Sequence, residues 1–188
     1  MNVNDAIMNP NFPKPEAGAR PPATTLAVIP TDLRQWVNEP TLVIWILETV
    51  ANLAPRPTAP AVPGEDGPPL PMMLSLVVYC YATGRYESAE IEANALSDDT
   101  ARYLCGNRIP AAVTIRQFRR CHRGLLGVCL VQLHKRAWRH RFGGSPVMAE
   151  MELGAPGSVQ TEIVFRLAAA AQDRIHRALL ADTMSLDV

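Results

Sequence analysis

The sequence has few aromatic residues and lacks the motifs of several common protein classes. Aromatic side chains make up 6% of its 188 residues, so we expect a mainly aliphatic core within an ordinary hydrophobic content of 48%. No apolar run approaches the roughly 20 residues that a membrane-spanning helix needs, so we expect no membrane segment. No Ser/His/Asp set, phosphate-binding loop or H-E-x-x-H motif is present, and we therefore expect neither an enzyme nor a cofactor or metal.

Cysteine usage argues against a zinc module and against a disulfide framework. The four cysteines, Cys80, Cys105, Cys121 and Cys129, form no C-x-x-C pair. Most of them lie within apolar or helical patterns, and no secretory signal is present, so we read them as reduced, small core residues. These features predict a cytoplasmic protein.

Acidic residues are absent from one long block of the chain. Residues 100–149 contain ten Lys/Arg and no Asp or Glu, whereas residues 1–99 contain five Lys/Arg and twelve Asp/Glu, and residues 150–188 contain three and six. The formal net charge of zero therefore hides a strongly basic block. Such a block is typical of proteins that bind a polyanion. Charge alone is equally consistent with a solvated face that pairs with acidic segments of the same chain.

Proline separates one predicted domain from its flanking segments. Residues 1–25 read as a Pro-rich flexible arm, and residues 26–142 as the domain. Within the domain, residues 55–71 contain seven prolines and predict a linker or surface loop. Residues 143–188 read as a linker followed by an additional C-terminal helix.

The spacing of apolar residues predicts an all-α, compact multi-helix fold. The segment 70–83 is apolar nearly all round, which is typical of a buried central helix. Trp36 and Trp45 are more consistent with core residues than with ligand platforms. The last helix repeats apolar residues every four positions, which is compatible both with packing on the domain and with pairing to a second copy. The expected helices cover residues 40–53, 70–83, 87–95, 97–105, 111–123, 124–142 and 158–183, after a short turn at 31–36.

Two successive basic helices, 111–123 and 124–142, predict a helix-turn-helix-like element. In the first, Ile115 and Phe118 lie on an inward stripe, and His122 beside them is more consistent with a structural histidine than with a base. Arginine and glutamine can read base edges or hold phosphates, although cations at a helix C-terminus also stabilise its dipole. The side chains expected to contact duplex DNA are Arg108, Arg116, Gln117, Arg119, Arg120, Arg123, Lys135, Arg136, Arg139 and Arg141.

Several ordered motifs carry a family resemblance. They are Tyr79-Cys80-Tyr81-Ala82-Thr83-Gly84, Ser88-Ala89-Glu90-Ile91-Glu92, and the set Pro110, Thr114, Ile115, Phe118, Arg119 and His122. With them, residues 26–142 resemble the N-terminal (InsH-like) domain of bacterial insertion-sequence transposases of the IS5/IS1182 type. One departure is Pro110-Ala111-Ala112, where the family often has an acidic helix cap. The resemblance implies DNA binding. The family continues into a catalytic RNase H-like domain, for which residues 143–188 offer no counterpart, so we expect no strand transfer.

These observations favour a transposase-derived DNA-binding protein associated with the nucleoid. One alternative is a protein-interaction or scaffold module that forms a homodimer through helix 158–183. Another is a truncated transposase remnant. Absent or salt-independent DNA binding would contradict the first hypothesis.

Overall fold

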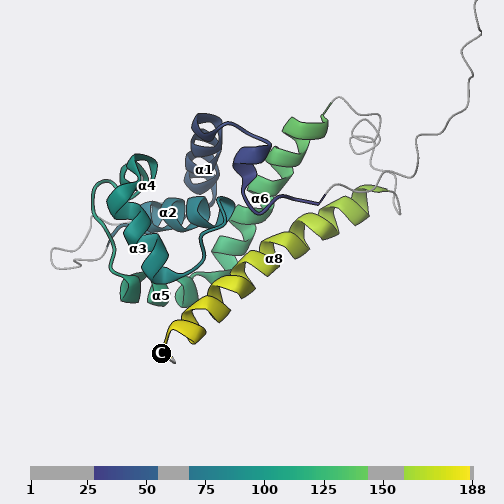
Figure 1. Cartoon of the computed structure of the whole chain (residues 1–188). Coiled ribbons are helices and arrows are strands. Elements are labelled where there is room, and N and C mark those ends of the chain that lie inside the picture. Colours follow the sequence, from purple (N-terminus) through teal and green to yellow (C-terminus); the bar gives the residue numbers. More distant parts are fainter. Residues whose placement is uncertain (1–27, 55–67, 144–158, 187–188) are drawn as a thin grey trace, which may run out of the picture.

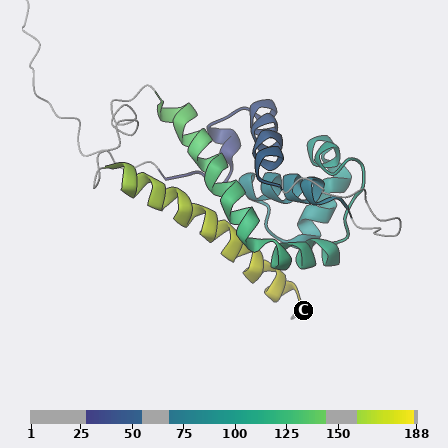
Figure 2. The ribbon, with the colours of Figure 1, turned by 180° about the vertical axis from the view of Figure 1, so that it is seen from behind.

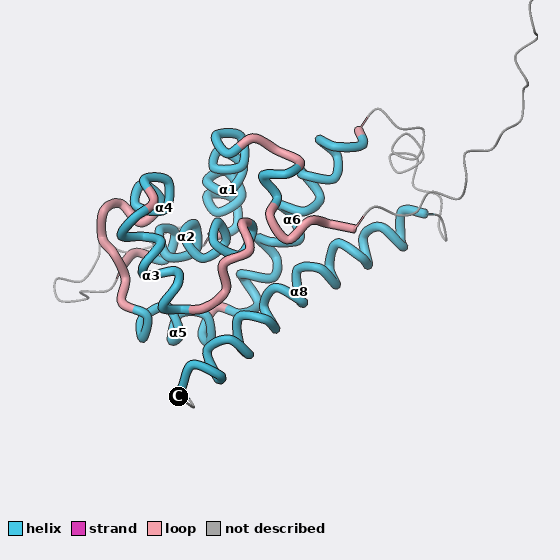
Figure 3. The backbone as a smooth tube through the Cα atoms, viewed as in Figure 1, coloured by secondary structure: helices cyan, strands magenta, loops and turns pink. Residues whose placement is uncertain are grey.

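The computed structural model describes residues 28–54, 68–143 and 159–186. Within these residues every regular element is a helix, and no strand is present (Figures 1 and 3). The predicted all-α fold is therefore confirmed. None of these helices is long and apolar enough to cross a membrane. The predicted arm 1–25, most of the Pro-rich loop and the linker after residue 143 lie outside the described residues.

The helices begin and end within three residues of the predicted ranges. Asp32 accepts a hydrogen bond from the Arg34 N–H at 2.9 Å, and Asp98 accepts one from the Ala101 N–H at 2.8 Å, so both cap helices as expected. Pro40 lies in the first turn of its helix. The elements are η1 (Leu33–Gln35), α1 (Glu39–Leu53), α2 (Leu70–Ala82), α3 (Ser88–Ser97), α4 (Asp99–Leu104), α5 (Ala112–Cys121), α6 (Arg123–Phe142) and α8 (Val159–Leu186).

Helix α2 is the centre of the fold. Every residue from 73 to 82 is buried, and α1, α4, α5 and α6 pack around the helix. The helix ends where Gly84 adopts φ +85° and the Arg85 N–H donates to the Cys80 carbonyl at 2.8 Å. That backbone conformation favours glycine, and a Cβ there would also lie 3.0 Å from the Thr31 methyl carbon. The Gly84 conformation and the Arg85–Cys80 hydrogen bond end α2 and turn the chain toward α3.

Helix α8 lies lengthwise against α6 and ends beside α5 (Figures 1 and 2). Its buried apolar stripe consists of Ile163, Leu167, Ala171, Ile175 and Ala178. On α6, a Cβ at Gly127 would lie 3.5 Å from the Ile175 side chain, in ordinary van der Waals contact, so the two helices pack directly against each other here. The sequence left open whether this helix packs on the domain or pairs with another copy, and the structure shows that its apolar stripe packs on the domain.

Aromatic side chains join η1 to the end of α6. Trp36 makes edge contacts with Trp138 and Phe142, with ring centroids 5.9 and 5.5 Å apart. Trp36 and Trp45 are both partly buried and pack against the core, as predicted.

Candidate nucleic-acid interface

The inner side of α5 holds this helix on the protein. Ile115 is fully buried, and Phe118 packs on the core with its ring centroid 4.6 Å from that of His122. The helix has no acidic cap of its own, but Glu92 of α3 accepts a hydrogen bond from the Ala112 N–H at 2.9 Å. A carboxylate at this position satisfies a free N–H group and is favoured by the helix dipole. The predicted inward stripe is therefore correct, and α3 supplies the missing cap.

The outer side of α5 carries most of the predicted DNA-contacting side chains. Gln117, Arg120 and Arg123 are exposed, Arg116 is half-buried, and Arg108 is exposed in the connection that precedes the helix. None of these four arginines forms an ion pair with another residue that the structure describes. Their guanidinium groups are therefore free to bind an external anion.

Arg119 is the exception, and the prediction that it contacts DNA is wrong. Its side chain is buried, and the whole residue is only 3% exposed. The guanidinium group forms an ion pair with Asp182 of α8, and it donates to the Ser88 hydroxyl at 2.6 Å and to the Tyr81 hydroxyl at 3.2 Å. It also donates to the Tyr86 carbonyl. A buried charge requires such partners, because removal from water is costly.

Asp182 connects the end of α8 to two other helices. Besides pairing with Arg119, its carboxylate accepts hydrogen bonds from the N–H and the hydroxyl of Ser88, each at 3.1 Å. Ser88 is the first residue of α3. The C-terminal part of α8 therefore fixes the position of α5, which carries the outward arginines. The sequence does not reveal this role, because Asp182 lies 63 residues from Arg119.

The basic end of α6 forms a second group of cations. Arg139 and Arg141 are exposed and Lys135 is half-buried, and none of the three has an ion-pair partner among the described residues. Arg136 differs, because it pairs with Glu48 of α1 at 2.5 Å and lies 5.4 Å from the centroid of the Trp45 ring. Arg136 therefore helps to hold α1 against α6.

The length of α6 separates the two groups of cations. Arg123 opens the helix and Arg139 lies sixteen residues later, which places them about 24 Å apart along the axis at about 1.5 Å per residue. A single residue, His122, connects helices α5 and α6. This junction is tighter than the three- to four-residue turn of a DNA-binding helix-turn-helix. The basic element is thus two consecutive helices with a cationic group at each end of α6.

Three of the four cysteines are core residues, as predicted, and the fourth is not. Cys80, Cys105 and Cys129 are buried, and burial raises the pKa of the Cys80 thiol to about 12 and that of Cys129 to about 11. These thiols stay protonated and act as small apolar residues. Cys121 is exposed on α5, so its prediction as a core residue is wrong. The described residues include no cluster of His, Cys, Asp or Glu that could hold a metal ion.

No family model, curated protein or solved structure matches this chain. The resemblance to transposase N-terminal domains therefore rests on the sequence motifs alone. The candidate interface rests on the placement of the cations described above.

Proposed function

We propose that this protein binds duplex DNA through the outer side of α5 and the basic end of α6. One observation carries the proposal. Of the ten side chains predicted to contact DNA, seven are cations that are exposed or half-buried and have no ion-pair partner in the described structure. The acidic side chains in the described part of the chain form no ion pair with these seven, which weakens the interpretation of the basic block as a self-paired surface. The implied transposase ancestry and a nucleoid location belong to this same proposal.

The two groups of cations serve different contacts in this proposal. Arg116, Gln117 and Arg120 project from one helix, and side chains of these types form the common bidentate contacts with guanine and adenine edges. The group at the end of α6 holds phosphates, which positions the protein without reading sequence. A separation of about 24 Å corresponds to about seven base-pair steps at 3.4 Å per step. One protein would therefore cover less than one turn of the duplex.

Fluorescence anisotropy with a short random-sequence duplex at low and near-physiological salt tests the proposal. We expect tight binding at low salt and a steep loss of affinity as salt rises, because each phosphate contact releases a counterion. Replacing a phosphate-contacting arginine should reduce the salt slope by about one. Arg139→Gln is the informative variant, because Arg139 belongs to the group at the end of α6 that holds phosphates, and Arg177→Gln is its control, since Arg177 is an exposed arginine of another helix, α8. Absent binding at low salt, or binding insensitive to salt, contradicts the proposal.

A protein-interaction role is the second candidate, because α8 exposes three large apolar side chains. Phe165, Leu180 and Met184 are 70%, 50% and 71% exposed on the helix that otherwise packs on the domain. A second copy of the chain could cover them in a homodimer. Light scattering of the native protein and of Phe165→Ser/Leu180→Ser tests this candidate. A native dimer that becomes a monomer in the variant supports it, and a native monomer excludes it.

A further inference from the structure

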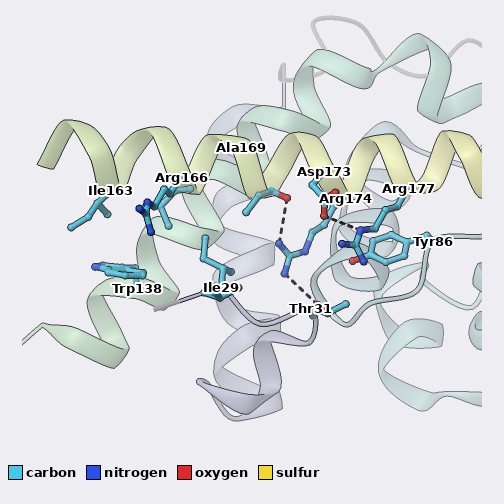
Figure 4. A pocket seen from close by; sticks show the side chains of 13 residues that line it. Ile29, Thr31, Tyr86, Trp138, Ile163, Arg166, Ala169, Asp173, Arg174 and Arg177 are labelled. Atoms are coloured by element: carbon cyan, nitrogen blue, oxygen red, sulfur yellow. Dashed lines mark hydrogen bonds and ion pairs between the residues drawn. The ribbon is translucent and has the colours of Figure 1, made fainter. Parts of the chain in front are cut away.

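A cavity of about 310 Å³ lies along one side of α8, beside the chain segment that leads into η1 (Figure 4). Trp138 of α6 lies at one end of the cavity, and Tyr86, in the connection between α2 and α3, lies at the other. None of the predicted DNA-contacting residues lines it. Its volume is at the lower end of the range of about 300–1,000 Å³ that is typical of small-molecule sites.

One end of the cavity is apolar. Trp138 packs with Ile163 and Leu167 in a buried cluster, and Ile29 covers the cluster from the segment before η1. Figure 4 shows Trp138 and Ile163 close together at this end, with Ile29 nearer the middle. An aromatic or branched aliphatic group placed here would lose contact with water and gain a tryptophan face.

The other end contains a buried arginine without a carboxylate partner. Arg174 is 3% exposed, and it donates to the backbone carbonyls of Tyr81 and Pro30 at 3.1 and 2.5 Å. It also donates to the Thr31 carbonyl at 3.2 Å (Figure 4). A longer contact of 3.5 Å reaches the carbonyl of Ala170. These bonds engage all three nitrogens of the guanidinium group, but carbonyl oxygens carry only partial charge, so the buried positive charge has no carboxylate ion pair among the described residues. Burial lowers the pKa of Arg174, as expected for a cation in this position.

Two further arginines line the cavity, and their carboxylate partners bind them weakly. Arg166 pairs with Glu162 at 2.7 Å and Arg177 with Asp173 at 2.8 Å, each within one turn of α8 and each about half exposed. Such exposed pairs contribute little energy, so an incoming anion can replace either carboxylate. Among the described residues that line the cavity, Asp173 is the only acid beside three arginines, so these residues carry three positive charges and one negative charge.

We propose that this cavity binds a small amphipathic anion, with its carboxylate, sulfonate or phosphate group near Arg174 and Arg177 and its apolar body against Trp138. The charged end supplies guanidinium donors that an anion can share, together with the hydroxyl groups of Thr31 and Tyr86 at the same end. The apolar end accepts a body of limited size. A ligand held in this way contacts α6, α8 and the segment before η1 together, so its binding should stabilise the fold.

A matched pair of fluorescent probes tests this site. Anilinonaphthalene sulfonate carries an anionic group on an aromatic body, and phenylnaphthylamine has the same body without the sulfonate. We expect one sulfonate probe per protein and affinity at least about tenfold weaker for the neutral probe, since the loss of one charge-assisted contact accounts for about that factor. Arg177→Gln should weaken sulfonate binding about tenfold and leave binding of the neutral probe unchanged.

Arg120→Gln, an exposed arginine of α5 outside the cavity, is the control and should bind the sulfonate probe like the native protein. Ala170→Phe adds bulk to the lining and should reduce binding of both probes. Circular dichroism of each variant must show native helicity, because a partly unfolded chain binds such dyes without specificity. Equal affinity for the two probes, more than one probe per protein, or equal effects of Arg177→Gln and Arg120→Gln each overturns the proposal. The titration contains no DNA, so its outcome is independent of the DNA-binding proposal.

Discussion

Helices α5 and α8 both carry arginines, but the acids that pair with these arginines come from different places. On α8, Arg166 and Arg177 each pair with a carboxylate four residues earlier in the same helix. On α5, Arg119 is the only arginine with an ion-pair partner among the described residues, and this partner, Asp182, comes from α8. The exposed pairs of α8 are local, whereas the buried pair joins two helices that are distant in the sequence.

Position relative to the core, and not the local number of charges, decides whether an arginine is buried in an ion pair or exposed to solvent. Arg119 and Arg120 are neighbours in an acid-free block, yet the first is buried and the second is exposed without an ion pair in the described structure. A buried pair is expensive to break, whereas exposed pairs contribute little. Variants that remove one acid from each class should therefore differ strongly in stability.

The largest effect should follow Asp182→Asn. This change leaves the Arg119 charge buried without its counterion, and breaking a buried pair in this way costs about 3–5 kcal/mol of unfolding free energy. Urea unfolding followed by circular dichroism measures the loss. The double variant Arg119→Met/Asp182→Leu should recover part of the stability, because an apolar pair needs no counterion, although Ser88 still loses its acceptor. Native stability of Asp182→Asn would show that the pair does not hold α8 on α5.

The next effect should appear in DNA affinity and not in folding. Arg116→Ala and Arg120→Ala should each weaken duplex binding by about 1–3 kcal/mol if these side chains contact bases. Neither arginine has an ion-pair partner within the described structure, so urea unfolding should change little. Anisotropy titration measures the affinity, with Arg177→Gln as control. Unchanged affinity in both variants would exclude the outer side of α5 as the DNA surface.

A smaller effect should follow acidification, because His134 is buried between α6 and α8. Its Nδ1 lies 3.1 Å from the Leu167 carbonyl, and burial, assisted by the nearby Arg174 charge, lowers its pKa to about 3. The unfolded chain has the ordinary histidine value of about 6.5 and so binds the proton first. Stability is therefore complete above about pH 6.5 and falls as the pH drops toward 3.

Between about pH 7 and pH 5 this histidine alone should cost about 2 kcal/mol of unfolding free energy. Urea unfolding at several pH values measures the slope, and His134→Gln is the control because glutamine can still donate to the Leu167 carbonyl but does not titrate. The variant should lose that part of the pH dependence. Equal slopes in the two proteins would show that His134 is not buried in its neutral form.

The helices could be predicted because their determinants are local. Asp32 and Asp98 lie directly before their helices, Gly84 follows α2, and the apolar spacing identifies the buried side of α5 and α8. These signals act over one or two turns, within the range that periodicity and capping describe.

The features that the sequence did not predict depend on contacts between distant segments. The burial of Arg119 requires Asp182, and the cap of α5 requires Glu92, and neither acid is near its partner in the sequence. Cys121 has helical neighbours of mixed character, and only the packing of α5 shows that it faces outward. The cavity beside α8 combines residues from four segments, so no single stretch of sequence could have revealed it.

The smallest effect on stability should follow Asp173→Asn, the counterpart of Asp182→Asn on the same helix. Asp173 and its partner Arg177 are both about half exposed and lie four residues apart, and such pairs contribute about 0.3–0.5 kcal/mol. Urea unfolding should therefore barely change. The same variant removes the acid from the cavity lining and frees Arg177, so the sulfonate probe should bind more tightly while the neutral probe does not. A large loss of stability would show that the exposed pair contributes as much as the buried one. Unchanged sulfonate affinity would show that Arg177 does not face the anion.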